Sequence, residues 1–167
     1  AVIACSDGTL RTIVVVGQEL VESGDPADLD GAIIEVLEWA ELDGNGSPDL
    51  LAGGPDGLRI IRQVTTFDPA TFEFTTTLAV TGLMPLAAAV ESISIADMDR
   101  DGRLDVVVSA GDGYLLRGAG NATFLESALL SPAPVGKIAI GDVNGDGWID
   151  AVATASTGLS IHLHPGV

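Results

Sequence analysis

The chain has 167 residues, of which 47% are hydrophobic, enough to bury the core of one domain. It carries 24 Asp and Glu against 7 Lys and Arg, and its formal charge of −17 would repel the phosphates of nucleic acids and of anionic membranes. Its single cysteine excludes an internal disulfide, and no apolar run approaches the roughly 20 residues of a membrane-spanning helix. We therefore expect neither a nucleic-acid partner nor a transmembrane segment.

The predicted strands recur along the chain in groups, three of which contain the same acidic segment. The chain opens on residues 1–17, which align with 151–166 near its other end. An alternating apolar stretch precedes each acidic segment, at 33–40, 91–96 and 136–141, and a short apolar run follows it, at 50–54, 106–111 and 151–156. A glycine-containing turn with a further strand comes next, at 55–64, 111–118 and 156–164, and a fourth strand follows twice, at 72–80 and 123–130. The two-residue alternation indicates strands and no helices.

One repeat is thus four antiparallel strands in about 45 to 55 residues, which is typical of a β-propeller blade. The sequence predicts an all-β chain, a β-propeller-like array of four-stranded antiparallel blades, two of them complete and two of them three-stranded and partial. We expect a single propeller-type domain or fragment, with a partial blade at 1–30, blades at 31–82 and 83–131, and a partial blade at 132–167. The number of blades stays open, between a small four-bladed ring and a larger ring that further chain or a partner completes.

The three acidic segments share a nine-residue pattern: ELDGNGSPD at 41–49, DMDRDGRLD at 97–105 and DVNGDGWID at 142–150. Carboxylates at the first, third, fifth and ninth positions can converge on one cation if the backbone wraps around it, and the seventh residue can add its carbonyl oxygen. Hard oxygen ligands in this number suit Ca²⁺. The sixth residue is always a glycine that permits the turn, namely Gly46, Gly102 and Gly147.

Two other interpretations of these segments agree less well with the sequence. An EF-hand needs a glutamate at the twelfth position between two helices, but that position holds Ala52, Val108 and Ala153 and the flanking segments are predicted strands. Ordinary hairpin turns also use Asp-Gly and Asn-Gly pairs. Because ten acidic side chains fall within these three short segments, their repulsion would oppose a compact turn without a cation, and metal loops are favoured.

The pattern resembles the FG-GAP and related VCBS repeats, the calcium-binding blades of integrin α-subunit heads and of many bacterial surface proteins. The similarity covers nearly the whole chain, although the FG and GAP tripeptides are not evident, so the resemblance is to the broader repeat class. It implies two to three Ca²⁺ ions, and the occupancy of the first loop stays open because this loop departs from the pattern, with Glu at its first position and Pro48 at its eighth. The implied ligands are Glu41, Asp43, Asn45, Ser47 (carbonyl) and Asp49; Asp97, Asp99, Asp101, Arg103 (carbonyl) and Asp105; and Asp142, Asn144, Asp146, Trp148 (carbonyl) and Asp150.

The resemblance also implies an extracellular, cell-surface or periplasmic location, because such loops need more free calcium than a resting cytosol offers. Two functions fit: a recognition or adhesion module whose partner is a protein subunit or a surface ligand, glycans included, or a structural subunit of a larger surface or membrane-associated assembly. No nucleophile elbow or Cys-His pairing is found, so we do not expect an enzyme. Partial blades would expose unpaired strand edges, so we expect the chain to be part of a larger chain or complex.

Overall fold

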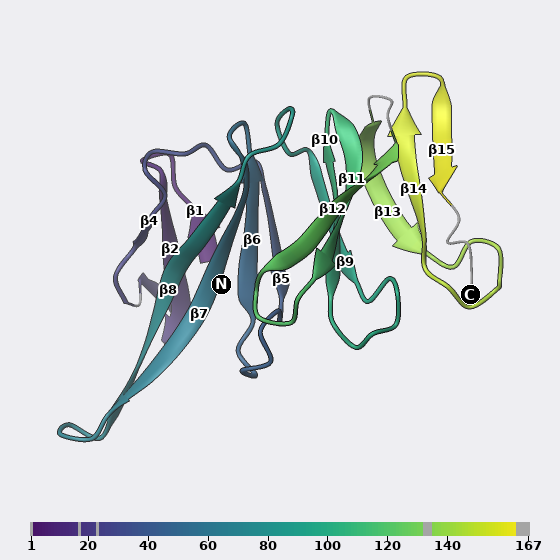
Figure 1. Ribbon diagram of the computed structural model, residues 1–167. Helices are drawn as coiled ribbons and strands as arrows, with labels where there is room; N and C mark the ends of the chain where they lie inside the picture. Colours follow the sequence, from purple (N-terminus) through teal and green to yellow (C-terminus); the bar gives the residue numbers. More distant parts are fainter. Residues whose placement is uncertain (1, 17, 23, 132–134, 163–167) are drawn as a thin grey trace.

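The computed structural model describes residues 2–16, 18–22, 24–131 and 135–162. Within these residues the chain forms strands β1 to β15 and no helix, and the strands make four antiparallel sheets. The sheets stand side by side in chain order, with the first and the last at opposite ends of the row (Figure 1). The predicted all-β, propeller-like fold is confirmed, and the described strands form an open row rather than a closed four-bladed ring.

The first sheet contains β1 (Val2–Ala4), β2 (Thr9–Val16), β3 (Glu19–Glu22) and β4 (Ala27–Asp28). The short strand β1 pairs with one edge of β2, while β3 and β4 pair one after the other with the opposite edge. The sequence predicts three strands here, and the outermost is divided in two. Gly24, with φ of 78°, and Pro26, which has no N–H to donate, lie between the two pieces and explain the break.

The second and third sheets are the complete four-stranded units. They contain β5 (Val36–Ala40), β6 (Asp49–Gly54), β7 (Gly57–Asp68) and β8 (Glu73–Met84), then β9 (Ser92–Ala96), β10 (Asp105–Ala110), β11 (Asp112–Gly118) and β12 (Phe124–Ser131). In each sheet the strands pair in sequence order. Every residue of β6 and β10 is buried, because sheets pack on both of their faces, which explains why these segments are almost wholly apolar.

The fourth sheet has three strands: β13 (Val135–Gly141), β14 (Asp150–Ala155) and β15 (Gly158–His162). Residues 163 and 164, which the sequence assigns to the same strand as β15, lie outside the described residues. There is no helix among the described residues that could cross a lipid bilayer.

Three apolar cores lie between neighbouring sheets. Leu10 and Leu29 pack with Leu50 and Ile61 between the first and second sheets. Alternate residues of the central strands point to opposite sides, so that Leu51 joins Val106 and Val108 in the next core, while Val107 joins Val135, Ile138 and Ala153 in the last. The hydroxyls of Ser92 and Ser94 also donate to the Ile138 carbonyl, at 3.3 and 3.1 Å. Each inner sheet is therefore held by side chains on both faces.

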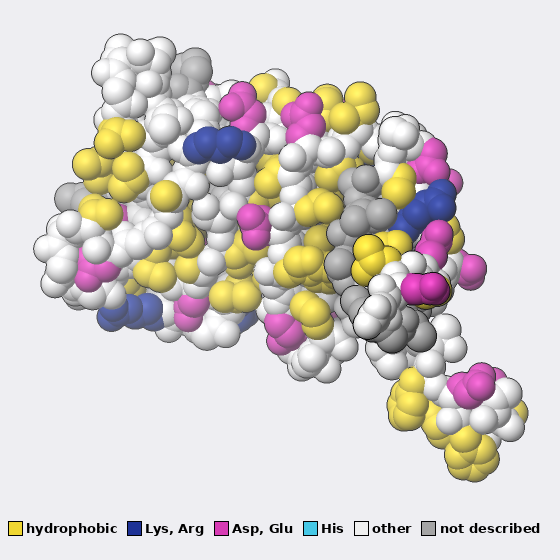
Figure 2. All heavy atoms as spheres, turned by 180° about the vertical axis from the view of Figure 1, so that it is seen from behind, with side chains coloured by type: hydrophobic (Ala, Val, Ile, Leu, Met, Phe, Trp, Pro, Cys, Tyr) yellow, Lys and Arg dark blue, Asp and Glu magenta, His cyan; other side chains and the backbone are white. Residues whose placement is uncertain are grey.

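The β7–β8 hairpin projects beyond the row as an arm (Figure 1). The pairing of β7 with β6 ends at Ile61, opposite Leu50, whereas its pairing with β8 continues to Asp68. The tip of the arm carries Phe67, Phe72 and Phe74, which are 47, 80 and 74% exposed. Figure 2 shows the tip as a knob set apart from the body, with hydrophobic side chains on its surface.

Candidate metal centres

The three acidic loops join β5 to β6, β9 to β10 and β13 to β14, and they lie along the same long edge of the row, the lower edge in Figure 1. The glycines at their sixth positions, Gly46, Gly102 and Gly147, have φ values of 80, 85 and 86°. Side chains other than glycine rarely adopt this left-handed region, so the predicted role of these glycines in the turn is confirmed.

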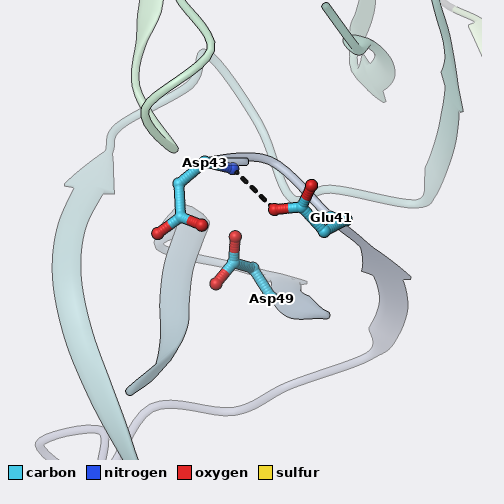
Figure 3. Close-up of side chains that lie close together, drawn as sticks. All are labelled: Glu41, Asp43 and Asp49. Atoms are coloured by element: carbon cyan, nitrogen blue, oxygen red, sulfur yellow. Dashed lines mark hydrogen bonds between the residues drawn. The ribbon is translucent and has the colours of Figure 1, made fainter. Parts of the chain in front are cut away.

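In the first loop, Glu41, Asp43 and Asp49 each offer an oxygen to one small region (Figure 3). These oxygens lie within 4.8 Å of one another. Glu41 Oε1 also accepts hydrogen bonds from the backbone N–H groups of Asp43, Gly44 and Asn45, at 3.2, 2.7 and 3.2 Å. The loop is thus wound around the Glu41 carboxylate, at the edge of a three-carboxylate group.

The second loop repeats this arrangement with Asp97, Asp99 and Asp105, whose offered oxygens again lie within 4.8 Å of one another. Asp101 is not in this compact group. Its Oδ1 accepts the N–H of Arg103 at 2.8 Å, and its Oδ2 pairs with the guanidinium of the same residue. The structure therefore brings together the first, third and ninth positions of both loops, and in the second loop it leaves Asp101, at the fifth position, outside this group.

In the third loop Asp142 holds the turn by accepting the N–H groups of Gly145 and Gly147, at 2.7 and 2.8 Å. Asn144 Nδ2 donates to Asp146 at 2.9 Å. Over residues 135–162 no group of three carboxylates is as compact as in the first two loops. The carbonyl oxygens of Ser47, Arg103 and Trp148, and the side chain of Asn45, stay predicted ligands.

The aspartate at the ninth position also joins each loop to its own sheet. Asp49 and Asp105 are 0 and 1% exposed. Each accepts one N–H from the second residue of its loop and one from the neighbouring strand, β7 for Asp49 and β11 for Asp105. The donors are Leu42 (3.2 Å) and Gln63 (3.1 Å) for Asp49, and Met98 (2.9 Å) and Gly118 (2.9 Å) for Asp105. Asp150 accepts the N–H of Val143 at 3.1 Å in the same way. The sequence pattern identified these residues as ligands only.

Burial raises the pKa of Asp49 and of Asp105, because a carboxylate removed from water loses hydration of its charged form, and the backbone N–H groups offset this only in part. A bound cation would favour the ionised form. Burial also acts to raise the pKa of Asp43, but hydrogen bonds from Arg62 and from the Asn45 backbone outweigh it, and the pKa is lowered.

Three arginines that the sequence reasoning did not include reach the loops. Arg62 Nε donates to Asp43 Oδ2 at 2.7 Å, and Arg117 Nη1 donates to Asp99 Oδ2 at 3.1 Å. A sequence signal for the first two arginines exists, because each ends a short apolar segment of its strand, RIIR at 59–62 and YLLR at 114–117. Arg100, from the second loop, donates to the Gly147 carbonyl and lies 4.1 Å from the ring centroid of Trp148, linking the second loop to the third.

The donor set fits a hard divalent cation. Carboxylate oxygens dominate it, and two of the three carboxylates in each compact group are largely withdrawn from solvent, Asp43 and Asp49 in the first, Asp99 and Asp105 in the second. Calcium takes six to eight oxygen ligands from carboxylates, carbonyls and water, so three converging carboxylates supply part of its shell. The residues present are compatible with that metal.

Comparisons with known proteins bear on the repeat and on the fold. No curated protein matches the sequence. Eight chains of solved structures match it, among them the crystal structure of BBS1N in complex with ARL6DN, soaked with lead, with 12% sequence identity and a TM-score of 0.53 over 96% of this chain. The chain spans 48% of that chain, about half its length, and the likeness shows the propeller-type fold alone. Residues 42–108, which run from the first acidic loop through the second, match the family described as FG-GAP-like repeat. The predicted resemblance is therefore confirmed: residues 42–108 are similar to an FG-GAP-like repeat, and the chain has a β-propeller-type fold.

Proposed function

We propose that the chain is a Ca²⁺-binding propeller module that recognises a protein or a glycan outside the cytosol and catalyses no reaction. The observation that carries this proposal is the convergence of three carboxylates at equivalent places in two successive sheets. A single acidic turn is commonplace, whereas the same three positions converging twice, in loops of the same repeat, are expected of a repeated metal site.

Calcium is proposed because the ligands are hard oxygens and because the chain carries a formal charge of −17. Two to three ions would neutralise part of that charge at one end of the sheets. The residues that would hold them are the first, third and ninth of each loop, completed by the fifth side chain and the seventh carbonyl. The bound ion would stiffen the loop and hold its carboxylates ionised.

Recognition is proposed because a rigid row of sheets with short connections presents its loops in fixed positions. The exposed phenylalanines of the β7–β8 arm add an apolar contact surface to it. The structural neighbour named above was solved in complex with a partner protein, which supports binding as the function of this fold. A surface, extracellular or periplasmic location follows from the free calcium that loops of this kind need.

Thermal unfolding tests the calcium proposal. One site held at a hundred times its Kd adds about 2.7 kcal/mol, which for a chain of this size is a rise in Tm of about 5–10 °C. We expect such a rise in millimolar CaCl₂ relative to EDTA, and a smaller rise in MgCl₂, because Mg²⁺ gives up its water reluctantly. Equal Tm values in calcium and in EDTA would show that the loops are turns without metal.

Calorimetric titration with CaCl₂ then assigns the ions. We expect Asp99→Asn to remove one binding event, because it takes a charge from the second loop. Asp25→Asn, an exposed aspartate outside the loops, is the matched control and should bind like the unaltered protein. If both variants behave alike, Asp99 holds no ion.

A second candidate, a structural subunit of a larger assembly, is favoured by the outer face of the fourth sheet. Val152 and Ile161 pair across β14 and β15, as Leu51 and Ile60 do in the second sheet and Val107 and Leu115 in the third. Leu51 and Val107 are fully buried against the next sheet, whereas Ile161 is 56% exposed. The second and third sheets cover this apolar face with the next sheet, whereas no described residue covers it on the fourth. A further β-sheet, from the same protein or another, would cover it.

A further inference from the structure

Two arginines occupy the same place in two successive sheets, next to the acidic loops. Arg62 lies in β7 and Arg117 in β11. Each comes one residue before the backbone N–H, of Gln63 or of Gly118, that is bonded to the buried aspartate of its loop. The strand pairing that places the N–H of Gln63 or Gly118 on the buried aspartate therefore also places the guanidinium of the preceding arginine beside the loop.

In the first loop the arginine occupies one oxygen of a carboxylate that belongs to the compact group. Arg62 bonds Asp43 Oδ2 through Nε, at 2.7 Å, and through Nη2. The other oxygen of Asp43 accepts the N–H of Asn45 at 3.1 Å. The Asp43 side chain is 2% exposed and that of Arg62 is 37% exposed, so the carboxylate is enclosed while the cation reaches it from the solvent side.

The second loop repeats the contact, since Arg117 Nη1 lies 3.1 Å from Asp99 Oδ2. In both loops this carboxylate belongs to the compact group of three. A divalent ion bound there would stand within a few ångströms of the guanidinium, at a distance where like charges repel strongly in partly buried surroundings. The ion must therefore displace the arginine or bind against its charge.

We propose that Arg62 and Arg117 are internal counter-cations of the first two loops, which neutralise the third-position carboxylate when no metal is bound and thereby weaken the binding of calcium. This inference rests on the proposed calcium sites. The arginines keep the loops folded at low calcium and set the sites to respond at higher calcium, since the metal has to replace a charge that is already in place.

The test compares the double variant Arg62→Gln/Arg117→Gln with the unaltered protein, by calorimetric titration with CaCl₂ and by thermal unfolding in EDTA. Two effects of opposite direction are expected. The Kd for calcium falls about tenfold at two sites, equivalent to about 1.4 kcal/mol per site, and Tm in EDTA falls because the carboxylates lose their counter-charge. Arg11→Gln is the control, because Arg11 pairs with Asp7 and Glu22 in the first sheet, away from the loops, and should leave the Kd unchanged.

An unchanged or weaker Kd in the double variant, with a Tm that falls equally in calcium and in EDTA, would overturn the inference and leave two structural ion pairs. Should the double variant not fold in EDTA, Arg62→Gln alone is titrated in calcium, where tighter binding supports the inference and unchanged binding rejects it. If the unaltered protein takes up no calcium, the proposed function itself fails. If it binds calcium and the variants bind no more tightly, only the role of the arginines fails.

Discussion

Among single residues, the aspartate at the ninth position of each loop has the most constrained surroundings. Asp105 is buried, and its two oxygens accept N–H groups from Met98 and Gly118, both at 2.9 Å. An asparagine has the same shape but only one oxygen, so its NH₂ group would face one of these donors. The residue is thus required as an acceptor at both oxygens, whatever its part in metal binding.

We expect Asp105→Asn to lower the free energy of unfolding by about 1–3 kcal/mol even in EDTA, because one buried N–H loses its acceptor. Urea unfolding in EDTA measures this, with Asp112→Asn, a hairpin aspartate outside the loops, as the control. A variant as stable as the control would show that the two hydrogen bonds carry no net stability and that Asp105 matters only through metal.

The sequence predicted part of this site, and the reason lies in which contacts are local. Glu41, Asp43 and Gly46 are close in the chain, and their spacing is sufficient to predict a wrapped loop. The contacts of Asp49 with Gln63 and of Asp43 with Arg62 depend on how β6 pairs with β7. Spacing within the loop contains no information on that register, so the arginines and the second role of the buried aspartate were missed.

Among the elements, the β7–β8 arm departs most from the sequence expectation. Strands were predicted at 55–64 and 72–80, but each extends to twelve residues, because the hairpin continues after β6 has ended. Phe67 and Phe74 pair across it with ring centroids 4.9 Å apart. Phe72 has φ of 58° and is 80% exposed. This left-handed conformation is unfavourable for a bulky residue, and the side chain gains little burial that would offset the strain. Local alternation predicts a strand equally well inside a sheet and in a free ribbon, so the arm itself could not be foreseen.

The arm is therefore expected to contribute little to stability. Phe72→Asn, which suits the left-handed conformation, should change the free energy of unfolding by less than about 1 kcal/mol. Ile61→Ala, in β7 of the same hairpin but in the core between the first and second sheets, should cost about 2–5 kcal/mol. Denaturant unfolding of both variants makes the comparison, and a loss above about 1 kcal/mol for Phe72→Asn would mean that the tip supports the fold.

Over the whole molecule, the sequence repeat predicted the order of the sheets, whereas the packing between sheets determines whether the row closes into a ring. The four groups of strands follow the predicted sequence, since each sheet forms from neighbouring segments joined by short turns. Whether the row closes depends on the small angle between successive sheets, which no single segment encodes. The fourth sheet therefore presents Leu159 and Ile161, 71 and 56% exposed, on its outer face.

Sedimentation at micromolar concentrations in calcium tests the consequence of that open face. We expect concentration-dependent self-association of the isolated chain, because an apolar sheet face of this kind is elsewhere in the row covered by a neighbour. Ile161→Lys should reduce it, while Leu20→Lys, an exposed leucine in the first sheet, should not. A compact monomer at every concentration would indicate that the fourth sheet needs no partner.

The root of the arm is tied to the first acidic loop at two adjacent residues, Arg62 through Asp43 and Gln63 through Asp49. From there the ribbon continues for six residue pairs, from Gln63 and Leu78 to Asp68 and Glu73, a reach of about 20 Å at the rise of a β-strand. The arm is therefore held beside the loop at its root, and its aromatic tip lies far from that contact. A rotation of about 10° at the root would carry the phenylalanines about 3 Å sideways over that reach, so a change in the loop that moves Arg62 or Gln63 would be enlarged at the aromatic tip.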